Sequence, residues 1–107
     1  MALTRSFRET VMEELRDKKF RRAFLREAIH DMLVGDLDSA KTVLREYING
    51  TIGFVQLGKA LGRSPKSLMR MLSGDGNPHA RNLLELLAYL QKADGVVVEI
   101  RMDDAAA

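Results

Sequence analysis

The sequence predicts a mainly α-helical single domain that ends in one short β-strand. Apolar residues recur at helical spacing through most of the chain, and turn-forming residues interrupt the pattern. Only residues 96–102 change period, because apolar side chains there alternate as in a strand. The 107 residues contain no repeat or low-complexity linker, so one domain (1–107) is expected. It divides into N-terminal helices (1–50), a central core (51–92) and the strand (96–102).

Three helices are expected in the first half of the chain. The first (6–17) begins with a capping box formed by Ser6 and Glu9. The second (19–34) and the third (36–50) carry apolar residues in i, i+4 rows, so each has one wide face for the core. These faces hold Phe20, Phe24, Leu25, Ala28, Ile29, Met32 and Leu33, and then Leu37, Ala40, Val43, Leu44, Tyr47 and Ile48.

Three more helices are expected in the second half, at 54–61, at 65–72 and from Asn77 onward. Residues 73–77 have turn chemistry throughout. Asn77 is the expected cap of the last helix, with Pro78 at its first position. Its inner residues are Leu83, Leu86, Leu87 and Leu90.

Residues 54–72 meet the requirements of a helix-turn-helix, in which two short helices cross steeply through a short turn. Gly58 supplies a small residue where the second helix passes, and Gly62 tolerates the positive φ of a turn. Ser64 and Pro65 cap and start the second helix. The residues expected to close the angle are Leu57, Leu61, Leu68, Met71 and Leu72.

Positive charge is concentrated around this motif, although the net charge is only +2. Residues 53–81 hold five Lys or Arg against the single acid Asp75. Long basic, short polar and flexible apolar side chains are the types that reach phosphates and base edges in the major groove. The expected DNA-binding residues are Ser64, Lys66, Ser67, Met69 and Arg70, with Lys59, Arg63, Asn77, His79 and Arg81 around them. The alternative is a plain helical hairpin whose basic residues are merely solvated.

Three segments resemble the HigA-like probable addiction module antidote proteins. They are residues 47–54 (YINGTIGF), 57–62 (LGKALG) and 66–72 (KSLMRML). Residues 2–7 and the turn 76–78 are also similar, so the resemblance covers nearly the whole chain. It implies a lambda-repressor-like DNA-binding bundle in an antitoxin that represses its own operon and neutralises a small RNase toxin.

Two positions depart from the wider helix-turn-helix pattern. Phe54 stands where Gln often contacts a phosphate, and Arg63 stands where an apolar residue is usual. A protein-interaction module that binds a toxin through a degenerate helix-turn-helix, without binding DNA, is therefore the second hypothesis.

The sequence offers no catalytic set, so no enzyme activity and no cofactor are expected. Cys is absent, which excludes thiolate catalysis and disulfides and suits a reducing cytoplasm. His30 and His79 are far apart, and we expect no metal site: His30 reads as a helix-surface residue without a carboxylate partner at ligand spacing. No apolar run approaches the length of a membrane span, so no membrane partner is expected.

The single strand requires a partner, because a lone strand leaves its backbone groups without a ladder. Its alternating face holds Val96, Val98, Ile100 and Met102. The same strand of a second subunit and the residues 2–4 of the same chain are the two competing partners. We hypothesise a symmetric homodimer in which the strands meet near the two-fold axis. Helix-turn-helix proteins usually bind as dimers to DNA sites with the same two-fold symmetry.

Overall fold

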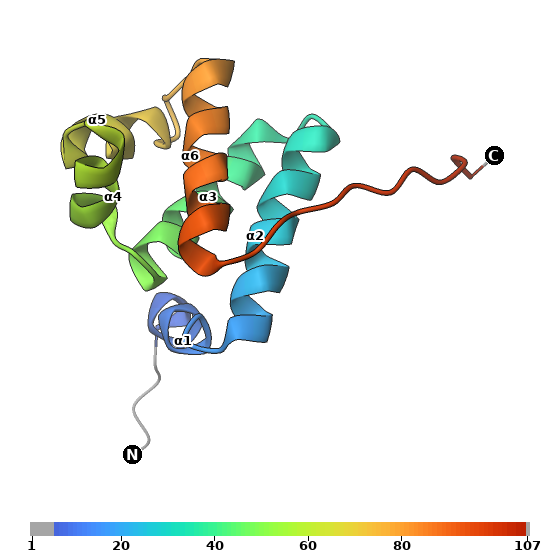
Figure 1. The fold of residues 1–107 in the computed structure, drawn as a ribbon, viewed down its shortest axis with the longest axis horizontal. Coiled ribbons are helices and arrows are strands. Elements are labelled where there is room, and N and C mark those ends of the chain that lie inside the picture. The colour runs from blue at the N-terminus through green and yellow to red at the C-terminus, as the bar shows by residue number, and fades with distance from the viewer. Residues whose placement is uncertain (1–5, 107) are drawn as a thin grey trace.

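The computed structural model describes residues 6–106, and this range contains six α-helices and no β-strand (Figure 1). The expectation of a mainly helical fold is confirmed, and the expected C-terminal strand is not seen in residues 6–106. The helices are α1 (Phe7–Glu14), α2 (Lys18–Leu33), α3 (Leu37–Gly50), α4 (Phe54–Leu61), α5 (Pro65–Met71) and α6 (Ala80–Asp94). None of these helices is long and apolar enough to cross a membrane.

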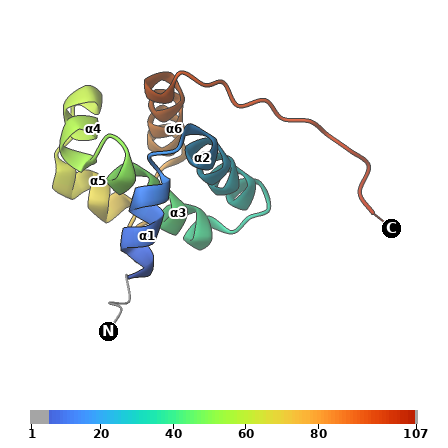
Figure 2. The same cartoon turned by 90° about the horizontal axis from the view of Figure 1, so that it is seen from below.

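Helix α3 contacts three other helices, α1, α2 and α4. The long helices α2 and α3 pack along each other, and α1 packs against α3. The short helices α4 and α5 form a pair on the other side, so that α6 lies between this pair and α2 in both views (Figure 1, Figure 2). The core between them is built from Val11, Leu15, Leu25, Ala28, Leu44, Tyr47, Ile48, Phe54, Leu57, Leu68, Leu72, Leu86, Leu87 and Leu90.

Side-chain caps start the helices of the first half. The Ser6 hydroxyl accepts from the Glu9 amide at 3.1 Å, and a carboxylate oxygen of Asp36 accepts from the Ser39 amide at 3.1 Å. Hydrogen bonding from Ser39 lowers the pKa of Asp36, because the bonds favour its charged form. The first helix ends at Glu14 and not near Asp17, because Asp17 is already the cap of α2.

The predicted apolar face of α2 is largely correct. Leu25 and Ala28 are buried, and Phe20 and Phe24 pack their rings against each other at the edge of the core. Leu33 is the exception, since it is exposed at the last residue of the helix. The third helix contributes its predicted face, with Leu44, Tyr47 and Ile48 fully covered.

The last helix begins later than the sequence predicts. His79, and not Asn77, is the N-cap of α6, and Pro78 lies before the helix. The turn continues through Gly76, whose amide donates to the Ser73 carbonyl. An added Cβ atom at Gly76 would collide with the Arg70 and Met71 carbonyls, so this turn lies directly under the end of α5. The chain therefore needs residues 77–79 to reach the first turn of α6.

Residues 96–106 form an extended arm that makes no strand ladder with any other segment of residues 6–106, although two of its amides bond to Gln91 of α6. A strand needs a second strand with which to share a hydrogen-bond ladder, and residues 6–106 contain no such strand. Residues 2–4, the competing partner within one chain, lie outside the described residues.

Candidate nucleic-acid interface

The α4–turn–α5 unit is built on two glycines. A Cβ atom added at Gly58 would lie 2.5 Å from the carbonyl oxygen of Arg63, so only glycine fits where the turn crosses α4. Gly62 ends α4 in the left-handed conformation, with φ of 68°. Ser64 then caps α5, because its hydroxyl accepts from the Ser67 amide at 3.1 Å, and Pro65 occupies the first position of the helix. The local predictions for this unit are confirmed.

Apolar side chains fix the angle between the two helices. Leu57, Leu68 and Leu72 are fully buried, while Leu61 and Met71 are half-buried at the rim of the core. Phe54 is buried as well. The position where the wider pattern places a phosphate-contacting Gln is therefore used for packing, and α4 gains a core residue at its first position.

The outward face of α5 is open to solvent. Lys66, Ser67 and Arg70 are exposed, and Met69 exposes 46% of its surface. Ser64 is also exposed, although its hydroxyl is engaged as the acceptor of the cap. The structure thus presents all five residues expected on the second helix on its accessible side, with two cations one helical turn apart.

A groove of about 320 Å³ runs beside this face, between α5, the loop 73–79 and the start of α6. It brings Ser67 and Arg70 together with Asn77 and His79. Its lining residues are Arg63, Ser67, Arg70, Met71, Asp75, Gly76, Asn77, Pro78, His79 and Asn82. Five cationic or polar residues predicted from separate segments, Arg63 included, therefore share one surface, together with the acid Asp75.

Arg63 has a different role from the one expected. Its guanidinium donates to the side-chain oxygen of Asn82 at 2.5 Å, and the residue is half-buried. This bond ties the turn between α4 and α5 to α6. Arg63 therefore lines the groove and also links the turn to α6.

The N-terminus of α6 opens beside the groove. Its N-cap residue His79 makes no side-chain cap hydrogen bond, so the first amides of the helix have no side-chain acceptor there. Uncapped amides at a helix N-terminus favour an anion through their partial positive charge. Arg81 is exposed on this first turn, and Lys59 is exposed on α4, but neither lines the groove.

Two basic residues of α3, which the sequence pattern does not single out, hold the loop in place. Lys41 is only 2% exposed, and its ammonium donates to the carbonyls of Gly74 at 3.3 Å and Gly76 at 2.7 Å. Arg45 donates to the Leu72 carbonyl at the end of α5. The sequence does hold a sign of the buried role of Lys41, because this residue lies on the apolar face of its helix, where a solvated lysine is not expected.

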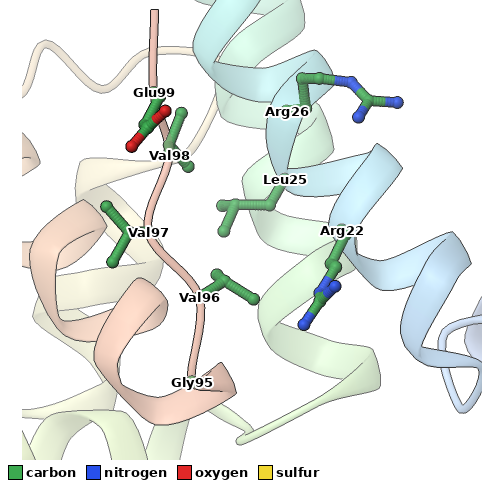
Figure 3. A pocket seen from close by; sticks show the side chains of 8 residues that line it. All are labelled: Arg22, Leu25, Arg26, Gly95, Val96, Val97, Val98 and Glu99. Carbon is green, nitrogen blue, oxygen red and sulfur yellow. The ribbon is translucent and has the colours of Figure 1, made fainter.

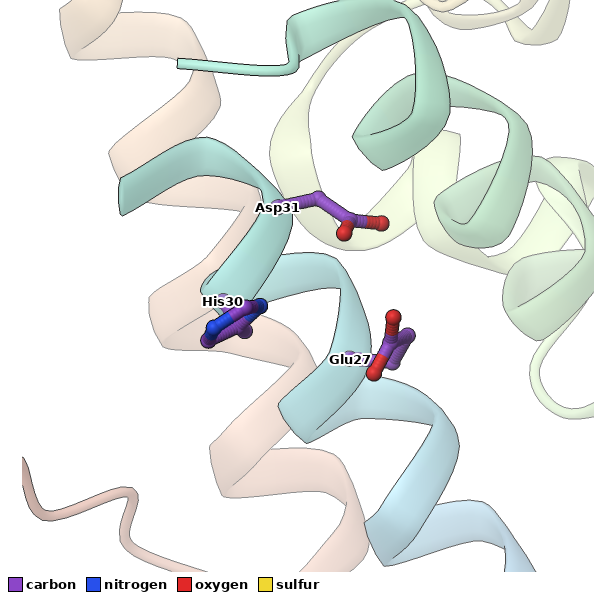
Figure 4. A group of neighbouring side chains, drawn as sticks. All are labelled: Glu27, His30 and Asp31. Carbon is purple, nitrogen blue, oxygen red and sulfur yellow. The ribbon is translucent and has the colours of Figure 1, made fainter. Parts of the chain in front are cut away.

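A separate cluster on α2 corrects the reading of His30. The ligand atoms of Glu27, His30 and Asp31 lie within 4.8 Å of one another, so this histidine does have carboxylate neighbours at ligand spacing (Figure 4). His30 is nevertheless exposed at the helix surface, as expected. One helical turn covers only one side of an ion, whereas a closed structural site needs four ligands. The cluster lies outside the groove and has no part in it.

Comparison of the chain with protein-family models, with curated proteins and with solved structures finds no match.

Proposed function

We propose that this protein binds duplex DNA in a sequence-specific manner, with α5 as the helix that enters the major groove. The observation that carries the proposal is the exposed face of α5, which presents Lys66, Met69 and Arg70 to solvent. The turn before this helix crosses α4 so closely that only Gly58 fits there. A short helix held at a fixed angle, with basic and flexible side chains outward, matches the docking of a helix-turn-helix.

Each group has a role that its chemistry suits. Arg70 is the candidate reader of a guanine edge, since an arginine can donate two parallel hydrogen bonds to it. Lys66 is a candidate phosphate contact at the start of α5. His79 and the uncapped amides of α6 are candidate contacts for a backbone phosphate beside the groove. The bases Lys59 and Arg81 add sequence-independent attraction around it.

We propose further that the protein is a binding protein and not an enzyme, a repressor and antitoxin of its own operon. The support is the sequence resemblance through residues 47–72 to probable addiction module antidotes. The partner would be a small RNase toxin, and the operator would be a two-fold site bound by two copies of the chain. Expression of the neighbouring open reading frame tests this part: its product should arrest growth, and co-expression of this chain should restore growth. Absence of toxicity or of rescue would remove the antitoxin assignment.

One observation favours a second candidate, a protein-interaction module that does not bind DNA. Phe54 is buried at the position where a typical motif places a phosphate-contacting Gln. The guanidinium of Arg63, at a position that is usually apolar, is bonded to Asn82 within the same chain.

A salt titration separates the two candidates. Duplex DNA from upstream of the coding sequence is titrated with the protein at several salt concentrations, beside a scrambled duplex of equal length. Phosphate contacts release counterions, so we expect log K to fall linearly with log salt, and the upstream duplex to bind more tightly than the scrambled one. Binding that is absent at low salt would favour the interaction module.

A further inference from the structure

The C-terminal arm, residues 96–106, has no part in the candidate DNA surface. It leaves α6 after Gly95 and runs away from the helices as extended chain (Figure 1, Figure 2). Only Val96 and Val98 are half-buried; they line a groove of about 400 Å³ against α2, where Val96 points toward Leu25 (Figure 3).

The apolar face of the arm continues beyond this contact. Ile100 is 65% exposed and Met102 is 91% exposed, although both share the alternating face of Val96 and Val98. Half of the face is thus left without a partner among residues 6–106.

The two backbone edges of the arm differ. The Val96 amide donates to the Gln91 carbonyl at 2.9 Å, and the Val98 amide donates to the Gln91 side-chain oxygen at 2.8 Å. In extended chain, the amides of alternate residues point to the same edge. The edge of the even-numbered residues is therefore held by α6, whereas the amides of Val97, Glu99 and Arg101 lie on the opposite edge. No hydrogen bond within residues 6–106 uses them.

We propose that the open edges of two copies of this arm pair antiparallel across a two-fold axis at Ile100. In this register, Glu99 of each copy lies directly opposite Arg101 of the other. Two cross-strand ion pairs can then form in place of the exposed Arg101–Asp103 pair within each arm, whose charged atoms lie 3.0 Å apart. Val98 lies opposite Met102, and the two Ile100 side chains face each other. Opposite charges and apolar pairs directly across two strands stabilise the pairing. The sequence around Ile100 is thus complementary to its own reverse.

Neighbouring registers are less favourable. A two-fold axis at Glu99 would place two glutamates opposite each other, and an axis at Arg101 would do the same with two arginines. Like charges directly opposite destabilise a strand pair. An axis at Met102 would set Ile100 opposite Asp104, and an axis at Val98 would leave Glu99 opposite an apolar residue.

The groove on α2 supplies a second complementary charge. In the proposed register, Asp104 of the second copy lies opposite Val96, on the face of the arm that packs against α2. Arg22 and Arg26 line the groove at this place, and neither guanidinium has a hydrogen-bond or ion-pair partner in the described part of the chain. The acidic end of one arm would therefore meet the basic groove of the other protomer.

The inference rests on one part of the proposed function, namely that two copies of the chain bind a two-fold operator. It is tested without DNA, so its failure and the failure of DNA binding are distinguishable. A chain that is monomeric at all concentrations would overturn the arm pairing and leave the DNA-binding proposal standing.

Cysteine cross-linking tests the register, because the chain contains no native Cys. The Ile100→Cys variant should form a covalent dimer under mild oxidation, since the opposed side chains of a non-hydrogen-bonded pair are within disulfide reach. Val98→Cys is the matched control and should not cross-link by itself, but it should cross-link when mixed with Met102→Cys. A monomeric Ile100→Cys, or a Val98→Cys that cross-links equally well alone, would overturn the register.

Charge reversal tests the ion pairs by sedimentation equilibrium. Arg101→Glu should raise the dimer dissociation constant about tenfold or more, because each copy exchanges an attraction for a repulsion. The double variant Glu99→Arg/Arg101→Glu should return the constant toward that of the wild type. Equal dimerisation of the single variant and the wild type, or a double variant no better than the single, would contradict the proposal.

Discussion

The amide of Arg63 donates a 2.9 Å hydrogen bond to the carbonyl oxygen of Gly58, and this bond closes the turn between α4 and α5. The same carbonyl also accepts from the amide of Gly62, the residue that ends α4. The path of the turn over α4 thus sets the angle at which α5 leaves. The exposed face of α5 depends on a glycine that itself is buried.

Replacing Gly58 should therefore change both stability and DNA binding. We expect Gly58→Leu to destabilise the protein by about 1–3 kcal/mol, because the side chain meets the turn backbone and must push it away. Ala60→Leu is the control on the same helix, where the position is exposed and a change of about 0.5 kcal/mol at most is expected. Urea denaturation measures both. Equal stability of the two variants would show that the turn does not cross α4 at this glycine.

A second prediction concerns the pair Arg21 and Asp94, which joins α2 to the end of α6. The guanidinium lies 2.9 Å from the carboxylate and also donates to the carbonyls of Leu15 and Arg16 after α1. The other oxygen of Asp94 is buried without a hydrogen-bond partner. Arg21→Ala should cost about 1–3 kcal/mol, because it leaves a partly buried carboxylate uncompensated. The exposed Lys19→Ala should stay near wild type, and a similar loss in both variants would argue against a specific role for the pair.

A third prediction concerns the loop that follows α5. Lys41→Met keeps the length of the side chain and removes the ammonium that Gly74 and Gly76 share. We expect a loss of about 1–3 kcal/mol and weaker DNA binding, because the loop positions Asn77. Asp38→Asn is the control, since this exposed carboxylate lies 3.5 Å from the same ammonium. If the control is as damaging as Lys41→Met, the ion pair and not the loop anchor matters.

A fourth prediction is an alkaline dependence of stability that arises from Tyr47. Burial, followed by the charge of Asp94, raises the pKa of Tyr47 from 10.0 to about 12. The neutral phenol is therefore favoured in the folded state. Its contribution to stability is fully present below about pH 10 and is lost as the pH rises from about 10 to about 12. Urea denaturation across this range should show a steeper loss for the wild type than for Tyr47→Phe, and parallel curves would contradict the assignment.

Features set by neighbouring residues could be predicted from the sequence. The cap at Ser64, the turn glycine at Gly62 and the apolar face of α3 each depend on spacing within one or two turns of helix. The exposed residues of α5 could also be predicted from the apolar residues of that helix, because burying one face of a helix leaves the other face to solvent.

Features set by contacts between distant segments could not be predicted in this way. The start of α6 was misplaced because Gly76 packs under α5, and the role of Lys41 depends on a loop more than thirty positions away. The bond of Arg63 to Asn82 likewise joins two different helices. The strand at residues 96–102 was expected from its alternation alone, which indicates a tendency to pair but does not supply the partner.

The most direct test of the DNA-binding face is a comparison of two double variants on the upstream duplex. Lys66→Ala/Arg70→Ala removes the two cations of α5, and Arg8→Ala/Lys19→Ala removes two exposed cations of α1 and α2. Both should fold normally, since exposed substitutions change stability by about 0.5 kcal/mol at most. We expect the α5 variant to lose about 1–3 kcal/mol of specific binding through Arg70 and to show a shallower salt slope, while the control binds nearly as the wild type does. An α5 variant that binds its own upstream DNA as tightly as the control would contradict the assignment of α5 as the reading helix.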